Sequence, residues 1–197
     1  MFKIEHLTFR YPNQAIFADY HAQISGNTWL YGPNGCGKTT LLRLLGGILV
    51  PQDGTIVWKD SRKYRASVLL NENLLYDDIR FDKQLSWICS VAQRDRNWLL
   101  SRCDGLDLEP LLPLTPGEMS QGMRRWATIA FVCAMPADVY LLDEPLAALD
   151  ADKCLLFHEF LKQRISQGDS FVITGHHADG IDDFQGLTGF ELHRGLA

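Results

Sequence analysis

The stretch Gly32-Pro33-Asn34-Gly35-Cys36-Gly37-Lys38-Thr39 decides the fold, because it carries the full G-x-x-x-x-G-K-T pattern of a phosphate-binding loop. Residues 27–31 before it are apolar and predict a strand, and residues 40–49 after it predict a helix. The glycines let backbone N–H groups approach a polyphosphate, and the helix adds the positive end of its dipole. Lys38 would contact the β- and γ-phosphates, and the Thr39 hydroxyl would ligate Mg²⁺. The sequence therefore predicts that residues 32–40, from Gly32 through Thr40, bind a nucleotide.

The composition is that of an ordinary globular protein. Of 197 residues, 46% are hydrophobic and 22% are charged, which excludes disordered and fibrous classes. The formal net charge is −5 and no basic stripe stands out, so no nucleic acid is expected as a partner.

The cysteines and the N-terminal residues together favour the cytoplasm as the compartment of this chain. Five widely spaced cysteines without a C-x-x-C pair favour a reducing compartment over a disulfide scaffold or a zinc site. Cys36 stands at a variable position of the loop, where thiol reagents could reach it. The first residues carry charges where a signal peptide would be apolar, and the longest uncharged stretch, Trp126 to Ala137, is too short to span a bilayer. We expect a cytoplasmic chain that works at a membrane only through a partner.

Alternating strands and helices predict an α/β fold with a mostly parallel sheet. Val139 to Leu142 and Ser170 to Ile173 are continuous apolar runs, which is typical of strands buried on both faces. At the N-terminus, the alternation of residues 2–9 and the stretch 15–24 predict half-buried strands in an antiparallel part. Further predicted elements are strands at 55–58 and 67–70 and helices at 119–135 and about 152–167.

The chain is predicted to be a single domain, 1–197. From about Leu74 the strands give way to helical runs with several Trp and Arg residues. We interpret residues 74–135 as a small helical lobe inserted into a core made of residues 1–73 and 136–197.

Polar residues follow the two buried strands at the edge where parallel sheets gather their ligands. Asp143 would complete the Mg²⁺ shell, and Glu144 would orient or deprotonate the attacking water. An acid pair that only caps a helix is the alternative. His176 and His177 follow the next strand, and a structural histidine is the alternative for each of them.

Tyr11 ends the first strand at a Tyr-Pro-Asn-Gln turn. Its side chain is either a surface aromatic of that turn or a platform on which adenine stacks.

These residues together resemble the ATP-binding subunit family of ABC transporters, and the resemblance covers nearly the whole chain. Met119-Ser120-Gln121-Gly122-Met123 stands about twenty residues before Asp143, where that family has its signature, usually L-S-G-G-Q. Ala148-Leu149-Asp150 matches the family's D-loop, and Tyr11 falls where its adenine-stacking aromatic lies. His176 aligns with the switch histidine at the γ-phosphate, with His177 as the alternative register.

The resemblance implies a P-loop ATPase that works as a head-to-tail dimer. Ser120, Gln121 and Gly122 of one copy would cap the ATP held by the Lys38 loop of the other, with Asp150 beside it. A homodimer is the simplest expectation, and a dimer with a related ATPase subunit is the alternative. Separate transmembrane permease subunits are the implied partners, and they would hold this chain at the inner face of the membrane. ATP and Mg²⁺ are the implied ligands.

Two departures from the family pattern affect these expectations. The glutamine usual after the 67–70 strand is Asn71, so a shorter arm would make the contact with Mg²⁺ and water. The signature ends in Met123, which loses one amide but keeps the serine and the glycine.

Three functions compete. The first is the energising subunit of a transporter; the compact size is similar to that of the haem exporter ATPase of cytochrome c maturation. The second is a soluble ABC-type ATPase that acts on a cytosolic assembly. The third, a nucleotide-gated binding module without turnover, is disfavoured because Lys38, Asp143, Glu144 and a histidine are all present.

Overall fold

The computed structural model describes residues 1–61, 63–71, 74–175 and 186–193. Within these residues the central sheet has five strands in the order β5-β6-β7-β3-β8, and every neighbouring pair is parallel. The strands are β3 (Asn27–Tyr31), β5 (Ala66–Leu69), β6 (Val139–Leu142), β7 (Phe171–Thr174) and β8 (Thr188–Glu191). Every residue of β6 and β7 is buried, as their unbroken apolar runs predicted.

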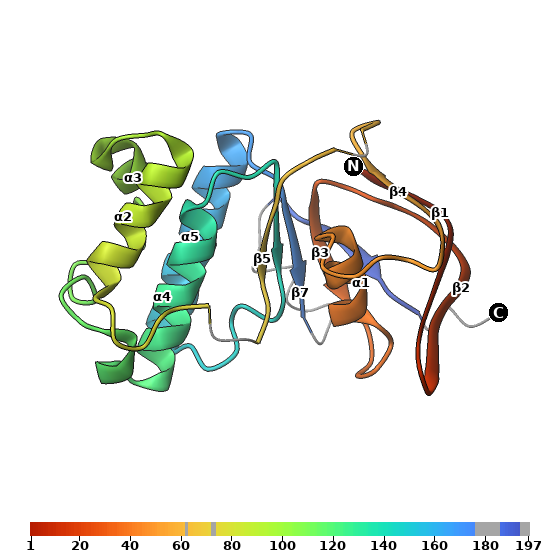
Figure 1. Ribbon diagram of the computed structural model, residues 1–197, viewed down its shortest axis with the longest axis horizontal. Coiled ribbons are helices and arrows are strands. Elements are labelled where there is room, and N and C mark those ends of the chain that lie inside the picture. Colours follow the sequence, from red (N-terminus) through yellow and green to blue (C-terminus); the bar gives the residue numbers. More distant parts are fainter. Residues whose placement is uncertain (62, 72–73, 176–185, 194–197) are drawn as a thin grey trace.

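A second sheet is antiparallel and has the strand order β2-β1-β4. Its strands are β1 (Phe2–Tyr11), β2 (Gln14–Ile24) and β4 (Asp53–Trp58). Helix α1 (Lys38–Leu45) lies between this sheet and the parallel one (Figure 1). The antiparallel part at the N-terminus was expected, and its apolar faces share one core with α1.

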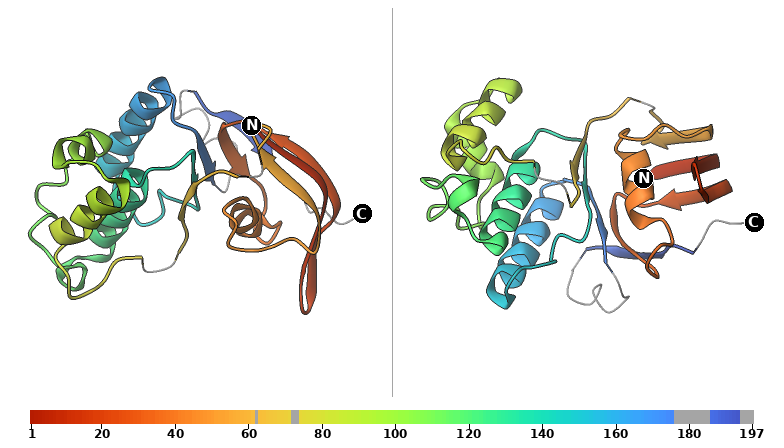
Figure 2. Two further views of the ribbon diagram at one scale, coloured as in Figure 1. Left: turned by 45° about the horizontal axis from the view of Figure 1, so that its top comes forward. Right: turned by 60° about the horizontal axis from the view of Figure 1, so that its bottom comes forward.

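The other helices in the described part of the chain lie on the opposite side of the parallel sheet (Figures 1 and 2). They are α2 (Phe81–Ala92), α3 (Arg96–Arg102), α4 (Gln121–Ala134) and α5 (Ala151–Ser166), with the 3₁₀ turn η1 (Pro116–Glu118) before α4. Helices α4 and α5 lie nearer the sheet, and α2 and α3 lie further out. Three of these helices fall within residues 74–135, whose status as a separate lobe remains a prediction.

Strand β6 shows how the sheet separates two cores. Val139 and Leu141 belong to the core around α1, whereas Tyr140 and Leu142 belong to the core around α4 and α5. Because side chains alternate between the faces of a strand, one short apolar run serves both cores. The strand's backbone is thereby fixed, and so is the position of the acid that follows it.

Several predicted boundaries were wrong. The predicted helix 40–49 begins at Lys38 and ends at Leu45, where Gly46 and a left-handed Gly47 (φ 69°) stop it. The predicted helix 119–135 begins at Gln121, because Ser120 caps its first turn and residues 116–118 form the 3₁₀ turn. The strand at 188–191 was not predicted. Within the described part of the chain, no helix is both long and apolar enough to cross a membrane.

Candidate functional site

The phosphate-binding loop connects β3 to α1, as its sequence context predicted. Gly37 caps the helix in a left-handed conformation (φ 110°), and a Cβ there would lie 2.8 Å from Ile16 Cγ2 of β2. Glycine is therefore required at this position by both backbone and space. Lys38 is buried, and its ammonium donates to the carbonyl of Gly32 at 2.7 Å, so the side chain lies back across the loop.

The middle of the loop differs from its ends in exposure. Pro33, Asn34 and Gly35 are exposed, while Cys36 is only 2% exposed. The expected access of thiol reagents to Cys36 is therefore wrong, because the thiol faces the protein next to Gly32.

A chain of hydrogen bonds joins the loop to the acid pair after β6. The Thr39 hydroxyl donates to one carboxylate oxygen of Asp143 at 2.7 Å, and the Thr174 hydroxyl donates to the other at 2.7 Å. Thr174 also accepts the backbone N–H of Glu144 at 2.9 Å. Asp143 is buried and satisfied on both oxygens, which explains how a carboxylate is tolerated there. The alternative of a helix-capping or surface acid does not describe Asp143.

Arg125 of α4 holds the backbone around the acid pair. One of its terminal nitrogens donates to the carbonyls of Asp143 and Glu144, each at 2.8 Å, and the other donates to the carbonyl of Leu70 at 3.3 Å. Burial lowers the pKa of this guanidinium, whereas the carboxylates of Asp143 and Glu144 counteract the shift. Glu144 itself has a left-handed backbone (φ 45°), a conformation that this support maintains.

The signature and D-loop residues stand at two helix starts. Ser120 caps α4 by accepting the Met123 N–H at 3.3 Å, and Asp150 caps α5 by accepting the Lys153 N–H at 2.8 Å. Binding of that N–H is the main cause that lowers the pKa of Asp150. Gly122 brings the two segments together, since a Cβ there would lie 3.2 Å from the Ala148 carbonyl oxygen.

Asn71 and Gln121 share a surface cavity of about 310 Å³ beside Ala148. Asn71 is exposed just after β5, so its side chain stands near the signature segment. Its proposed contact with Mg²⁺ remains a prediction.

Tyr11 lies close to the start of α1. Its hydroxyl is 3.5 Å from Thr40 Oγ1, and its ring packs edge-on against Phe9. The aromatic is thus next to the nucleotide loop in space as well as in sequence, which leaves both interpretations open. His176 and His177 lie outside the described residues.

Two residues of this network were missed from the sequence. Thr174 had one available signal, since it is the polar residue that ends a buried apolar strand. No signal in the sequence distinguishes Arg125 from its neighbour Arg124. The structure shows that Arg124 instead forms an ion pair with Asp77 at 2.8 Å.

Comparison with known proteins decides the family. The sequence profile of the family described as ABC transporter matches residues 20–147 of this chain. The chain belongs to the ABC transporter family. It is an ATP-binding subunit that hydrolyses ATP to power a transporter.

Curated relatives of this ABC ATPase are bacterial transporter proteins. An ABC transporter ATP-binding protein of Bacillus subtilis, YybJ, is 33% identical over 77% of this chain and 73% of its own length. Two cytochrome c biogenesis ATP-binding export proteins are similar as well. That of Wolbachia pipientis is 28% identical, with 89% of each chain covered, and that of Pseudomonas fluorescens is 31% identical, with 74% of each covered.

Solved structures share the fold. The ATP-binding subunit of an ABC transporter superposes with a TM-score of 0.83 at 20% identity, covering 99% of this chain and 87% of that chain. A dimeric bacterial ABC transporter cassette superposes with a TM-score of 0.80 at 18% identity, covering 97% of this chain and 94% of that chain. The prediction of an ABC-type P-loop fold is confirmed.

Proposed function

We propose that two copies of this ABC ATPase close head to tail around ATP, with the α4 start of one copy against the phosphate loop of the other. The observation that carries the proposal is a difference in exposure: Ser120 and Gln121 at the start of α4 are exposed, while Lys38 and Asp143 are buried. The N-terminus of a fourteen-residue helix favours anions. In support, a solved cassette of the same fold is described as dimeric.

Within each copy, we assign roles to the residues by their chemistry. Lys38 and the loop amides would bind the β- and γ-phosphates, and Glu144 would orient or deprotonate water. His176 would contact the γ-phosphate. The hydroxyl of Thr39 and the carboxylate of Asp143, 2.7 Å apart, are hard oxygen donors that suit Mg²⁺. These two residues would hold the ion, which neutralises phosphate charge when bound.

A trapped dimer tests the proposal. Glu144→Gln removes the base but keeps the size of the side chain, so with saturating Mg-ATP it should accumulate as a dimer on gel filtration and turn over slowly. Lys38→Ala, in the same column and nucleotide, should stay monomeric. A Glu144→Gln protein that remains monomeric in saturating Mg-ATP would contradict the head-to-tail mechanism.

As a finer proposal, the transporter is an exporter of the cytochrome c biogenesis type, with separate membrane subunits that hold this chain at the inner face. The names of the Wolbachia and Pseudomonas relatives favour this branch. Tagged Glu144→Gln, solubilised from its host's membranes with Mg-ATP, should bring down a polytopic membrane protein in stoichiometric amount. Recovery of a cytosolic assembly instead would favour the soluble ATPase.

A further inference from the structure

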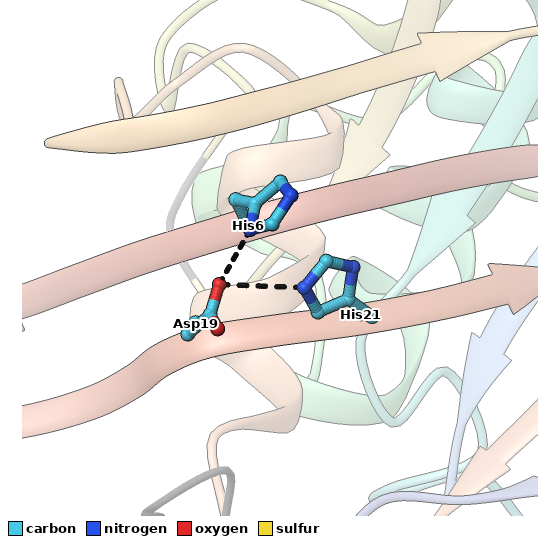
Figure 3. Close-up of side chains that lie close together, drawn as sticks. All are labelled: His6, Asp19 and His21. Carbon is cyan, nitrogen blue, oxygen red and sulfur yellow. Dashed lines mark hydrogen bonds and ion pairs between the residues drawn. The ribbon is translucent and has the colours of Figure 1, made fainter.

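His6, Asp19 and His21 gather on the outer face of the antiparallel sheet, outside the nucleotide site (Figure 3). One oxygen of Asp19 lies 2.7 Å from His6 Nδ1 and 3.3 Å from His21 Nε2. The two imidazole rings stand edge to face with their centroids 4.3 Å apart. The three side chains therefore converge on one point although they come from two strands.

The backbone is shaped to bring them there. Ile4 pairs with Ala22 and Leu7 with Tyr20, so residues 5 and 6 of β1 face the single residue His21 of β2. This is a β-bulge, and His6 adopts its left-handed conformation (φ 53°). Ile4 and Leu7 are buried on either side, so without the extra residue the alternation would turn His6 into the core.

A second β-bulge, on β2, turns the Asp19 side chain to the same surface. Leu7 pairs with Tyr20 and Phe9 with Phe17, so residues 18 and 19 together face Thr8. Asp19 is left-handed as well (φ 51°), and the Thr8 hydroxyl accepts its backbone N–H at 3.3 Å. Bulges re-aim side chains, and these two aim His6 and Asp19 at each other.

The third strand also accommodates the first bulge. Gly54 of β4 lies directly against it, because a Cβ on Gly54 would lie 2.3 Å from the carbonyl oxygen of His6. Gly54 has φ 91°, so glycine is required there for two reasons. The left-handed backbones of His6 and Asp19, together with the tightly packed Gly54, thus place the cluster at the surface.

We propose that His6, Asp19 and His21 bind a divalent first-row transition metal ion such as Zn²⁺, Ni²⁺ or Cu²⁺. Two imidazoles and one carboxylate form a ligand set that suits these ions rather than Mg²⁺ or Ca²⁺. Their three ligand atoms all lie within 4.8 Å of one another, so side-chain rotations suffice to bring each to about 2.1 Å from a common ion. Water would complete the coordination, because all three residues are exposed.

The surrounding charge favours a cation. Asp19 brings an acidic side chain into the cluster itself. A surface depression of about 670 Å³ beside the cluster is lined by Glu5 and Asp53 as well. Glu5 is partly neutralised by Lys3, at 2.8 Å.

A bound ion would join β1 to β2 at mid-length. Phe17, two residues before Asp19, packs next to Gly37 of the phosphate loop, 3.2 Å from where a Cβ would stand. The ion would therefore stabilise the strand that supports the loop, and the effect is measurable without ATP.

Titration calorimetry of the full chain with Zn²⁺ alone, in metal-free buffer, tests the proposal. We expect one ion per chain, with affinity at least about tenfold weaker in His21→Gln and in Asp19→Asn. His21 lies at an ordinary backbone position, and Asn tolerates the left-handed conformation of residue 19, so both variants should fold. The melting temperature should rise with Zn²⁺ in the wild type and less in the variants.

His193→Gln is the matched control. His193 is exposed and 3.8 Å from the Glu191 carboxylate, a histidine beside an acid outside the cluster. Its replacement should leave Zn²⁺ affinity unchanged. The same affinity in His21→Gln and Asp19→Asn as in the wild type would overturn the proposal, and so would an equal loss in His193→Gln.

Discussion

Thr39 and Asp143, which are 104 positions apart in the chain, are joined by a hydrogen bond of 2.7 Å from hydroxyl to carboxylate. The bond connects the first turn of α1 to the end of β6, so the phosphate loop and the acid pair form one hydrogen-bonded unit. Thr174 extends this unit to β7 by donating to the second oxygen of Asp143. Three segments thus meet at one edge of the sheet, where we propose that the phosphates of ATP bind.

Thr174→Val should lower ATP turnover and stability together. Valine keeps the shape of threonine but leaves one Asp143 oxygen and the Glu144 N–H without the hydroxyl partner. Each unsatisfied buried group costs about 1–3 kcal/mol, and loosening of Glu144 should reduce kcat at least about tenfold. Urea unfolding and steady-state ATPase assays measure both effects. Thr174→Ser restores the hydroxyl, so a serine variant as impaired as valine would argue against the hydrogen bonds.

Arg125→Met should destabilise the acid pair by removing the donors to three carbonyls. Methionine replaces the aliphatic stem of arginine and has no guanidinium, so the carbonyls of Leu70, Asp143 and Glu144 lose their partner. We expect about 1–3 kcal/mol of lost unfolding free energy. Arg96→Met, on the exposed start of α3, is the control and should stay within about 0.5 kcal/mol of wild type. Equal losses in both variants would remove the special role of Arg125.

The sequence predicted the fold and the closeness of Thr39 to Asp143 because both follow from strong patterns. A complete phosphate-loop motif between a strand and a helix, and acids after an unbroken apolar run, place Thr39 and Asp143 at the same edge of a parallel sheet. Their closeness follows from the topology, and the hydrogen bond between them follows from their side chains. The assigned roles of Glu144, Asn71 and His176 stay predictions, since the chemistry of a side chain requires more than its place.

The features that the sequence did not predict depend on the conformation or direction of single residues. The bulges at His6 and Asp19 shift the alternation by one residue, and such a shift looks like an ordinary irregularity in a sequence. Arg124 and Arg125 are neighbours of the same type, and only the direction of each on α4 decides which one reaches the acid pair. Helix α1 ends early because Gly47 takes a left-handed conformation that its sequence permits but does not require.

Tyr11→Ala should weaken the binding of ATP more than the binding of inorganic triphosphate. If adenine stacks on the ring, its loss removes about 1–3 kcal/mol of base binding and leaves the phosphate contacts untouched. Tyr11→Phe keeps the ring and loses only the hydroxyl near Thr40, so it should bind ATP nearly as wild type. Equilibrium dialysis with both ligands measures the difference. An equal loss for ATP and triphosphate would make Tyr11 a residue of the turn only.

Alkaline pH should destabilise the protein through two buried thiols. Burial raises the pKa of Cys103 to about 11 and that of Cys133 to about 12, whereas a thiol in an unfolded chain titrates near 8.5. Between about pH 9 and 11 the unfolded chain has lost protons that the folded chain retains. The unfolding free energy therefore falls as pH rises, by about 1.4 kcal/mol per pH unit for each thiol, and the stabilisation is fully present below pH 8.

Urea unfolding of wild type and Cys133→Ala from pH 8 to 10.5 isolates this effect. Alanine lowers stability at every pH by leaving a cavity, but it should also flatten the alkaline slope by the contribution of one thiol. The difference in slope between the two proteins belongs to Cys133 together with the Coulomb coupling of its thiolate to Cys103 and Tyr140. Cys89→Ala, at a partly exposed position, serves as the control for the substitution itself. Parallel curves for wild type and Cys133→Ala would mean that this thiol is not the group that resists ionisation in the folded state.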